Sequence, residues 1–316
     1  MKIGVFGVGH LGKIHLKCLK ETDWTIAGIY DPDEQASQKA ADEYGVQIYT
    51  DMAALIADSD AIDIVSTTMS HYDVAIQAMD ASKHIFIEKP MASSLEQAQK
   101  IVQLSSEKDI KVQVGHVERY NPAIKAIINR GLTPKFVEAH RLTMFNTRGN
   151  DVSVVYDLMI HDIDLVLSMI DSPIKDVQAN GVCVVNDTPD ICNARITFAN
   201  GAVANLTASR ISMKNMRKIR FFQEDEYISS DLIKKENQII SLTPADEDTE
   251  GMTIISSSGK KLVNIEMPEV LPTNAIAHEL QDFYNSIAED MPTAVDANAG
   301  FAAMYLAHEI DKAMNL

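Results

Sequence analysis

The sequence predicts an α/β protein with two domains: a doubly wound parallel sheet, followed by an α+β domain with a large open, mainly antiparallel sheet. The 316 residues exceed the usual size of one domain. The first third alternates short β-branched runs with amphipathic stretches, and the later part carries successive strand patterns separated by turns. We expect the domains to comprise residues 1–120 and 121–316.

Five short apolar runs of the first domain are predicted to be parallel strands. They are Lys2–Phe6, Thr25–Tyr30, Ile62–Val65, His84–Ile87 and Lys111–Val114. A helix is expected at Asp33–Tyr44, which Gly45 ends, and another after Ser93, which fits a capping box with Glu96.

The pattern changes after Asn121-Pro122. A long helix is predicted near Val154–Ile170, and strands are predicted from about Ile174 to Glu266, with turn signals such as Asn200-Gly201. Two closing helices follow, and these are expected at Thr273–Ala288 and Asp296–Met314.

Composition excludes several classes of protein. A net charge of −17 without a basic run argues against a nucleic-acid partner. Three widely spaced cysteines predict neither a disulfide framework nor a CxxC metal site. Glycines break the N-terminal apolar run long before signal-peptide length, and no run approaches the roughly 20 apolar residues of a membrane span. We therefore expect a cytoplasmic protein that does not attach to membranes.

The first predicted strand runs into Gly7-Val8-Gly9-His10-Leu11-Gly12 and then into a helix. At such a turn Gly7 allows the tight bend, Gly9 lets the backbone approach a pyrophosphate, and Gly12 lets the helix pack on the strand. The alternative is a tight turn without a ligand. The context favours a Rossmann domain whose cofactor contacts Gly7, Gly9, His10, Leu11 and Gly12.

Asp31 follows the second predicted strand, nineteen positions beyond Gly12. A carboxylate there accepts hydrogen bonds from the adenosine ribose and repels a 2′-phosphate, so Asp31 predicts NAD rather than NADP. The alternative role is a helix N-cap, which Asp33 supplies equally well.

Three motifs in this order resemble the Gfo/Idh/MocA oxidoreductases: GxGxxG, Glu88-Lys89-Pro90, and Asp157 with His161 four residues later. The resemblance covers essentially the whole chain. It implies that the open sheet is a subunit interface, as in a homodimer or homotetramer. It also implies that Ser66, Thr67, His71, Glu88 and Lys89 lie near the nicotinamide, although the segment Val65–His71 lacks the proline usual in the family.

Within the family, residues 115–123 and 155–164 are similar to the branch that oxidises the 3-hydroxyl of UDP-N-acetylglucosamine. The resemblance therefore implies a sugar or nucleotide-sugar substrate. Another sugar, an inositol or a diol remains an alternative, and so does a non-catalytic NAD-sensing or partner-binding protein, because a fold does not establish an activity.

Alcohol oxidation requires a titratable group near the hydroxyl, and Lys89 and His161 are the candidates. Lys89 follows a strand at the sheet edge where ligands bind, and Asp157 precedes His161 by one helical turn and can orient it. The alternative for His161 is a core histidine with a structural carboxylate. A metal site with Asp162 and Asp164 is not expected, because consecutive helical residues point in different directions.

Basic and amide side chains outside these motifs are candidates for holding an anionic substrate. Arg119, Asn121 and Arg148 are the substrate-binding candidates, and Arg141 has the same chemistry. The alternative for each is solvation or an ion pair among 45 acidic residues.

Overall fold

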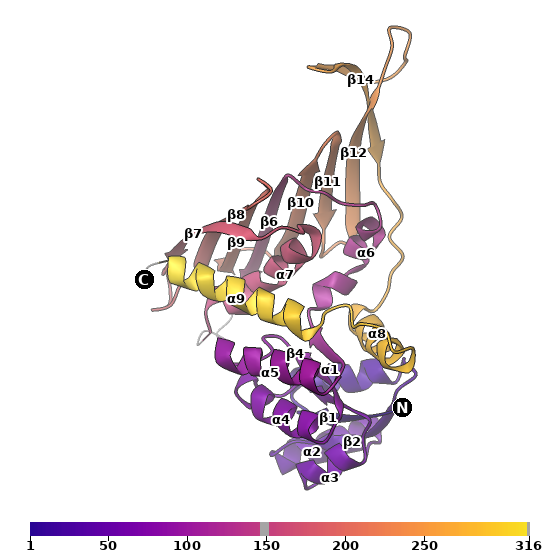
Figure 1. The fold of residues 1–316 in the computed structure, drawn as a ribbon, viewed down its shortest axis with the longest axis vertical. Coiled ribbons are helices and arrows are strands. Elements are labelled where there is room, and N and C mark those ends of the chain that lie inside the picture. The colour runs from indigo at the N-terminus through magenta and orange to yellow at the C-terminus, as the bar shows by residue number, and fades with distance from the viewer. Residues whose placement is uncertain (146–151, 315–316) are drawn as a thin grey trace. The chain divides into compact units, whose positions relative to one another are not determined.

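The computed structural model describes residues 1–145 and 152–314. The chain folds into two compact units (Figure 1). The first unit contains Met1–Tyr120 and Asn274–Tyr305, and the second contains Asn121–Thr273 and Leu306–Leu316.

The first unit is built on a parallel sheet. Its strands are β1 (Lys2–Phe6), β2 (Thr25–Tyr30), β3 (Ala61–Ile64), β4 (His84–Glu88) and β5 (Val112–Gly115), in the order β2-β1-β3-β4-β5. A single parallel bridge joins Ile29 to Ile48. This bridge occupies the place of the outermost strand in the 3-2-1-4-5-6 Rossmann order. The predicted doubly wound sheet is confirmed, with strand ends shifted by at most one residue.

Helices accompany these strands. They are α1 (His10–Leu19), α2 (Glu34–Tyr44), α3 (Met52–Ala57), α4 (Thr68–Asp80), α5 (Leu95–Glu107), the 3-10 helix η1 (Val117–Tyr120) and α8 (Ala275–Ala288). Asp33 caps α2, and Gly45 ends it with φ +67°. The capping box predicted for α5 is wrong by one residue: Ser94 caps the helix, and the side chain of Gln97 accepts the Ser93 N–H.

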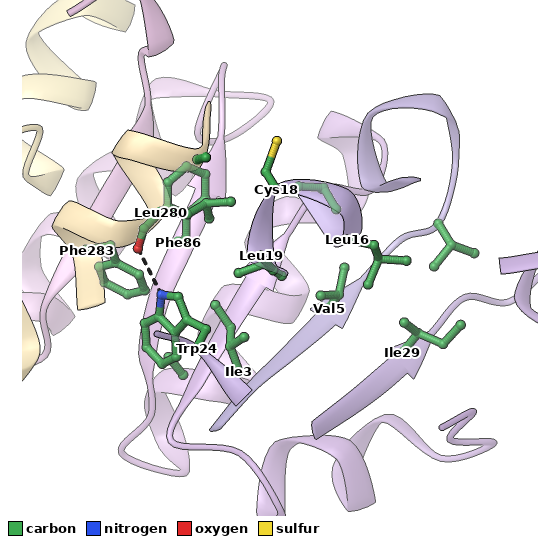
Figure 2. Close-up of a cluster of buried hydrophobic side chains, with 14 of the residues drawn as sticks. Ile3, Val5, Leu16, Cys18, Leu19, Trp24, Ile29, Phe86, Leu280 and Phe283 are labelled. Carbon is green, nitrogen blue, oxygen red and sulfur yellow. Dashed lines mark hydrogen bonds between the residues drawn. The ribbon is translucent and has the colours of Figure 1, made fainter. Parts of the chain in front are cut away.

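The predicted boundary after residue 120 coincides with the first unit boundary, but α8 departs from the predicted division because it packs in the first unit. The indole Nε1 of Trp24 donates to the carbonyl of Leu280 at 2.9 Å. Phe283 lies beside the same indole, with ring centroids 5.7 Å apart (Figure 2). Amphipathic periodicity marks an apolar face on α8 but does not reveal which sheet that face covers.

The second unit contains a nine-stranded sheet among the described residues (Figure 1). Its strands are β6 (Phe136–Met144), β7 (Ile174–Val182), β8 (Ile191–Phe198), β9 (Val203–Ser212), β10 (Met216–Gln223), β11 (Glu226–Asp231), β12 (Glu236–Pro244), β13 (Thr253–Ser256) and β14 (Gly259–Glu266). Their order is β13-β14-β12-β11-β10-β6-β9-β8-β7, and β6 pairs with β9 in parallel while the other neighbours are antiparallel. The predicted mainly antiparallel sheet is confirmed.

Helices accompany this sheet. They are α6 (Pro122–Ile128), the π-helical turn η2 (Val155–Met159), α7 (Ile160–Met169) and α9 (Ala297–Ala313), within which the unit boundary falls. Buried positions alternate along the central strands, as expected for a sheet with one covered face. In the part of the chain that the structure describes, no helix has the length and apolar character that crossing a membrane requires.

Candidate active site

The glycine-rich loop after β1 is held tightly from one side and is open on the other. Gly7 has φ +100°, and a Cβ atom there would lie 2.7 Å from the backbone nitrogen of Ser66. A Cβ atom on Gly12 would lie 2.1 Å from the carbonyl oxygen of Gly7. By contrast, no atom lies within 4 Å of the Cβ position at Gly9. The loop therefore packs closely at Gly7 and Gly12 and leaves space for a ligand at Gly9.

Helix α1 begins at His10, directly after Gly9, and no side chain caps it. Its first turn contains no acidic residue, so the N–H groups and positive dipole end of the helix suit an anion. His10 is exposed and Leu11 is half-buried. The open Gly9 and the uncapped helix fit the pyrophosphate of a dinucleotide.

We expect Gly12→Ala to impair stability and Gly9→Ala to impair NAD binding. Gly12→Ala should lower stability by about 1–3 kcal/mol or more, because its methyl group meets backbone. Gly9→Ala should leave the melting temperature nearly unchanged but weaken NAD binding, because its methyl group projects into the open space. Thermal melts and NAD titrations of both variants test this contrast. Unimpaired NAD binding by a folded Gly9→Ala variant would contradict it.

Asp31 receives two backbone N–H groups. Its Oδ2 accepts from Val8 at 2.8 Å and its Oδ1 accepts from Asp33 at 2.9 Å. The alternative role as the cap of α2 belongs to Asp33, whose Oδ1 accepts from Gln35 and Ala36. Asp31 thus fastens the glycine-rich loop to the end of β2, and each oxygen keeps a second lone pair for a ligand.

Three of the predicted cofactor residues follow β3: Ser66 and Thr67 lie in the loop, and His71 lies in α4. Ser66 is half-buried and Thr67 is exposed. The ring of His71 is buried, with Nδ1 3.0 Å from the carbonyl oxygen of Pro90 and Nε2 3.1 Å from that of Ser66. Burial lowers the pKa of His71, and a neutral ring donates to only one carbonyl at a time. His71 therefore connects the loops after β3 and β4, so we expect it to shape the cofactor site indirectly.

Glu88 ends β4 at the carboxyl edge of the sheet, and Lys89 follows it. Lys89 is half-buried, and its backbone N–H donates to Glu88 Oε2 at 3.1 Å. The Glu88 side chain is buried and lies 3.3 Å from His15 Nε2, while His15 Nδ1 lies 3.0 Å from Asp63 Oδ2. The sequence reasoning missed His15 and Asp63. One signal was available, since Asp63 interrupts the apolar strand Ala61–Ile64.

Asp157 and His161 lie in the second unit, where the predicted long helix begins with the π-helical turn. Asp157 is within that turn, and His161 is in the first turn of α7; both are half-buried. Single π-helical turns occur frequently at functional sites. The start of this helix is fastened by Ser153, whose hydroxyl donates to Asp311 Oδ1 at 2.7 Å.

Asp162, next to His161, forms a buried ion pair. Arg141 on β6 donates to it through Nε at 2.9 Å and through Nη2 at 2.7 Å. Both residues are almost fully buried, so Arg141 is not exposed for an anionic substrate. Within residues 1–145 and 152–314, no three His, Cys, Asp or Glu side chains are grouped to hold a metal ion.

The substrate-binding candidates have different positions. The amide of Asn121 is buried: its Oδ1 caps Ala123 N–H at 3.1 Å and its Nδ2 donates to the Leu232 carbonyl at 3.0 Å. The fold thus uses both amide atoms, and a substrate contact of Asn121 stays a prediction. Arg119 is half-buried and donates to the Ala294 carbonyl at 3.1 Å. Arg148 lies outside the described residues.

The parallel sheet, the open glycine loop and the acidic residue after β2 together define a dinucleotide-binding protein. Residues 1–116 match the family model "Oxidoreductase family, NAD-binding Rossmann fold", and residues 126–228 match the "GFO/IDH/MocA C-terminal domain". The chain belongs to the Gfo/Idh/MocA family and is an NAD-dependent oxidoreductase that acts on hydroxyl groups.

Three relatives are informative. UDP-N-acetylglucosamine 3-dehydrogenase of Acidithiobacillus ferrooxidans is 35% identical over 95% of this chain and 93% of its own. Its solved structure matches with a TM-score of 0.90, at 33% identity over 99% of this chain and 97% of that one. Myo-inositol 2-dehydrogenase of Thermotoga maritima is 23% identical over 99% of this chain and 96% of its own. Levoglucosan dehydrogenase in complex with NADH and levoglucosan shares the fold, with a TM-score of 0.86 and 19% identity over 100% of this chain and 97% of that one.

Proposed function

We propose that the protein oxidises the 3-hydroxyl of UDP-N-acetylglucosamine. The observation that carries this proposal is the likeness to a UDP-N-acetylglucosamine 3-dehydrogenase, which extends over 95% of this chain and 93% of the relative. A match of this length includes both the cofactor unit and the unit that contains Asp157 and His161.

In the proposed reaction the carbinol C–H bond breaks with its electron pair, and the hydroxyl proton leaves for a base. Bound NAD supplies the hydride acceptor. His161 takes the proton, Asp157 orients the imidazole, and the ammonium of Lys89 stabilises the negative charge that develops on the oxygen. The backbone of Gly9, the N-terminus of α1 and the Asp31 carboxylate would hold the cofactor.

A panel of substrates tests this assignment through NADH absorbance. UDP-N-acetylglucosamine should reduce NAD, whereas inositol and free glucose should not. A single-turnover measurement accompanies the panel, because slow release of NADH can hide activity. Faster turnover of a neutral polyol than of any UDP-sugar would contradict the nucleotide-sugar proposal and leave the dehydrogenase class intact.

The diphosphate of such a substrate is repelled at long range by a chain of net charge −17. Salt screens this repulsion beyond about 10 Å, so local guanidinium groups must outweigh it. We propose that Arg119 and Arg148 do so. Replacing both with Gln should raise the Michaelis constant for UDP-N-acetylglucosamine, and an unchanged constant would contradict their role.

The cofactor preference should depend on Asp31. We expect the wild type to bind NAD more tightly than NADP, and Asp31→Ala to reduce that preference, because it removes the ribose acceptor and the repulsion of a 2′-phosphate. Dissociation constants of both cofactors measure it. Asp33→Ala is the matched control, since it removes the cap of α2 but should preserve the preference. Tighter binding of NADP by the wild type would overturn the proposal.

We also propose a cytoplasmic homodimer or homotetramer. Cys18, Cys183 and Cys192 are all free thiols, which suits a reducing compartment. Several large apolar side chains of the second unit are exposed, among them Ile255, Ile265 and Met267, and a second copy of the chain would cover such residues. Light scattering of the purified protein measures the number of subunits.

A further inference from the structure

Three buried ionisable side chains connect α1, the helix after the glycine-rich loop, to Lys89. His15 on α1 lies between Asp63 on β3 and Glu88 on β4, with nitrogen–oxygen distances of 3.0 and 3.3 Å. His15 and Asp63 are 0% exposed and Glu88 is 9% exposed. Glu88 then accepts the backbone N–H of Lys89. The contacts therefore form a continuous path through the interior of the first unit.

Burial and the neighbouring charges together determine the pKa of each group in this cluster. Burial disfavours the imidazolium, yet Asp63 and Glu88 raise the pKa of His15 well above its usual value. Burial likewise disfavours the Glu88 carboxylate, but His15 and the charge of Lys89 lower its pKa. Burial raises the pKa of Asp63. At neutral pH an ionised Glu88 thus faces the His15 imidazolium, and the charge of Lys89 favours the same ionised form.

Other titratable groups near the cluster contribute little charge. His71 on α4 has a pKa lowered by burial, and Cys18 on α1 has a pKa raised by burial, so both are neutral at pH 7. The ring of Phe86 lies edge-on to His15, with centroids 5.6 Å apart. An apolar neighbour of this kind leaves the charges of the cluster weakly screened.

The fold reserves space for the Glu88 carboxylate. Strand β5 places Gly115 opposite Glu88 in the parallel register. A Cβ atom on Gly115 would lie 2.6 Å from Glu88 Oε1 and 2.7 Å from its Cδ. Any larger residue at this position would push the carboxylate away from His15 and from the Lys89 backbone.

We infer that His15 and Asp63 are positioning residues for Lys89: they hold the Glu88 carboxylate on the Lys89 backbone N–H, which fixes the residue at the end of β4 and keeps a negative charge close to it. The inference rests on the proposed function, in which that ammonium meets the substrate hydroxyl. Burying ionised groups is costly unless they are paired, and a neutral hydrogen bond would suffice to attach α1 to the sheet. Glu88 accepts the backbone N–H of Lys89, so the ionised cluster ends at the residue that is proposed to meet the substrate hydroxyl.

The test measures how the acetylation rate of Lys89 depends on pH, by mass spectrometry of the full chain without cofactor or substrate. The midpoint of this curve should fall by about one unit in Glu88→Gln, because removal of a close opposite charge shifts an ionisation by about that much or more. Smaller shifts in the same direction are expected for His15→Gln and Gly115→Ala, in which the carboxylate remains but is no longer held. His84→Gln is the matched control at the opposite end of β4 and should leave the midpoint unchanged.

Thermal melts of the same variants separate this role from a purely structural one. If Glu88→Gln and Gly115→Ala melt at lower temperature but keep the wild-type midpoint, the cluster only stabilises the fold and the inference is overturned. Should His15→Gln fail to fold, these two variants decide the question. Labelling requires neither NAD nor a sugar, so a failed substrate panel would contradict the proposed function without affecting this result.

Discussion

Replacing His161 or Lys89 with alanine is expected to lower the turnover number by about 10² to 10⁴-fold, the usual contribution of a general acid or base. The dissociation constant of NAD should change little, because the loop at Gly9 and the carboxylate of Asp31 remain. Turnover is measured at saturating UDP-N-acetylglucosamine, and NAD binding is measured by titration.

Two matched controls make the result specific. His140→Ala removes a half-buried histidine of β6 in the second unit, and Lys100→Ala removes a lysine of α5 that contacts Gln103. Both should retain wild-type turnover. Full activity of His161→Ala would exclude it as the base. A Lys89→Ala variant that loses NAD binding as severely as turnover would assign Lys89 to the cofactor instead.

The second large effect concerns stability. Removing one member of the Arg141–Asp162 pair leaves the other charge buried without its partner, which typically costs about 3–5 kcal/mol. We therefore expect Asp162→Leu to lower the melting temperature of the second unit by roughly 6 to 20 °C. The double variant Arg141→Met with Asp162→Leu should recover much of this loss, because it removes both charges.

Calorimetry of the two variants and the wild type measures the effect. Equal melting temperatures for the single and double variants would show that the lost packing, and not the unpaired charge, determines stability at this position. Arg220→Gln is the control, since Arg220 pairs with Glu138 at the sheet surface, where both side chains are about one-third exposed. Its effect should stay below about 1 kcal/mol.

The elements of the first unit were predictable because local signals coincide there. β-branched runs give the strands, and the glycine motif gives the first turn. Asp33 and Gly45 mark the two ends of α2. The order of the strands in the second sheet was not predictable, because β6 pairs with β9 across more than sixty residues of chain and no local pattern encodes that partner.

The site was predictable only in part. Motifs predict roles for Gly9, Asp31 and Lys89, because the signal for each lies in its immediate sequence neighbours. They do not identify His15, because the residue that pairs with its imidazole is Asp63, forty-eight positions later in the chain. The same limit explains Asn121 and Arg141: each carries groups suited to a ligand, and the fold uses those groups for its own backbone and for Asp162.

The return of α8 to the first unit has a consequence for how this protein can be made and divided. A fragment that stops at Tyr120 would emerge with Trp24 lacking the helix that covers it, so we expect such a fragment to be aggregation-prone. On the ribosome, Trp24 is synthesised 256 residues before its partner Leu280 on that helix. Chimaeras that exchange the cofactor unit must therefore transfer two separate stretches of the gene, and a single cut at the apparent boundary would leave both products incomplete.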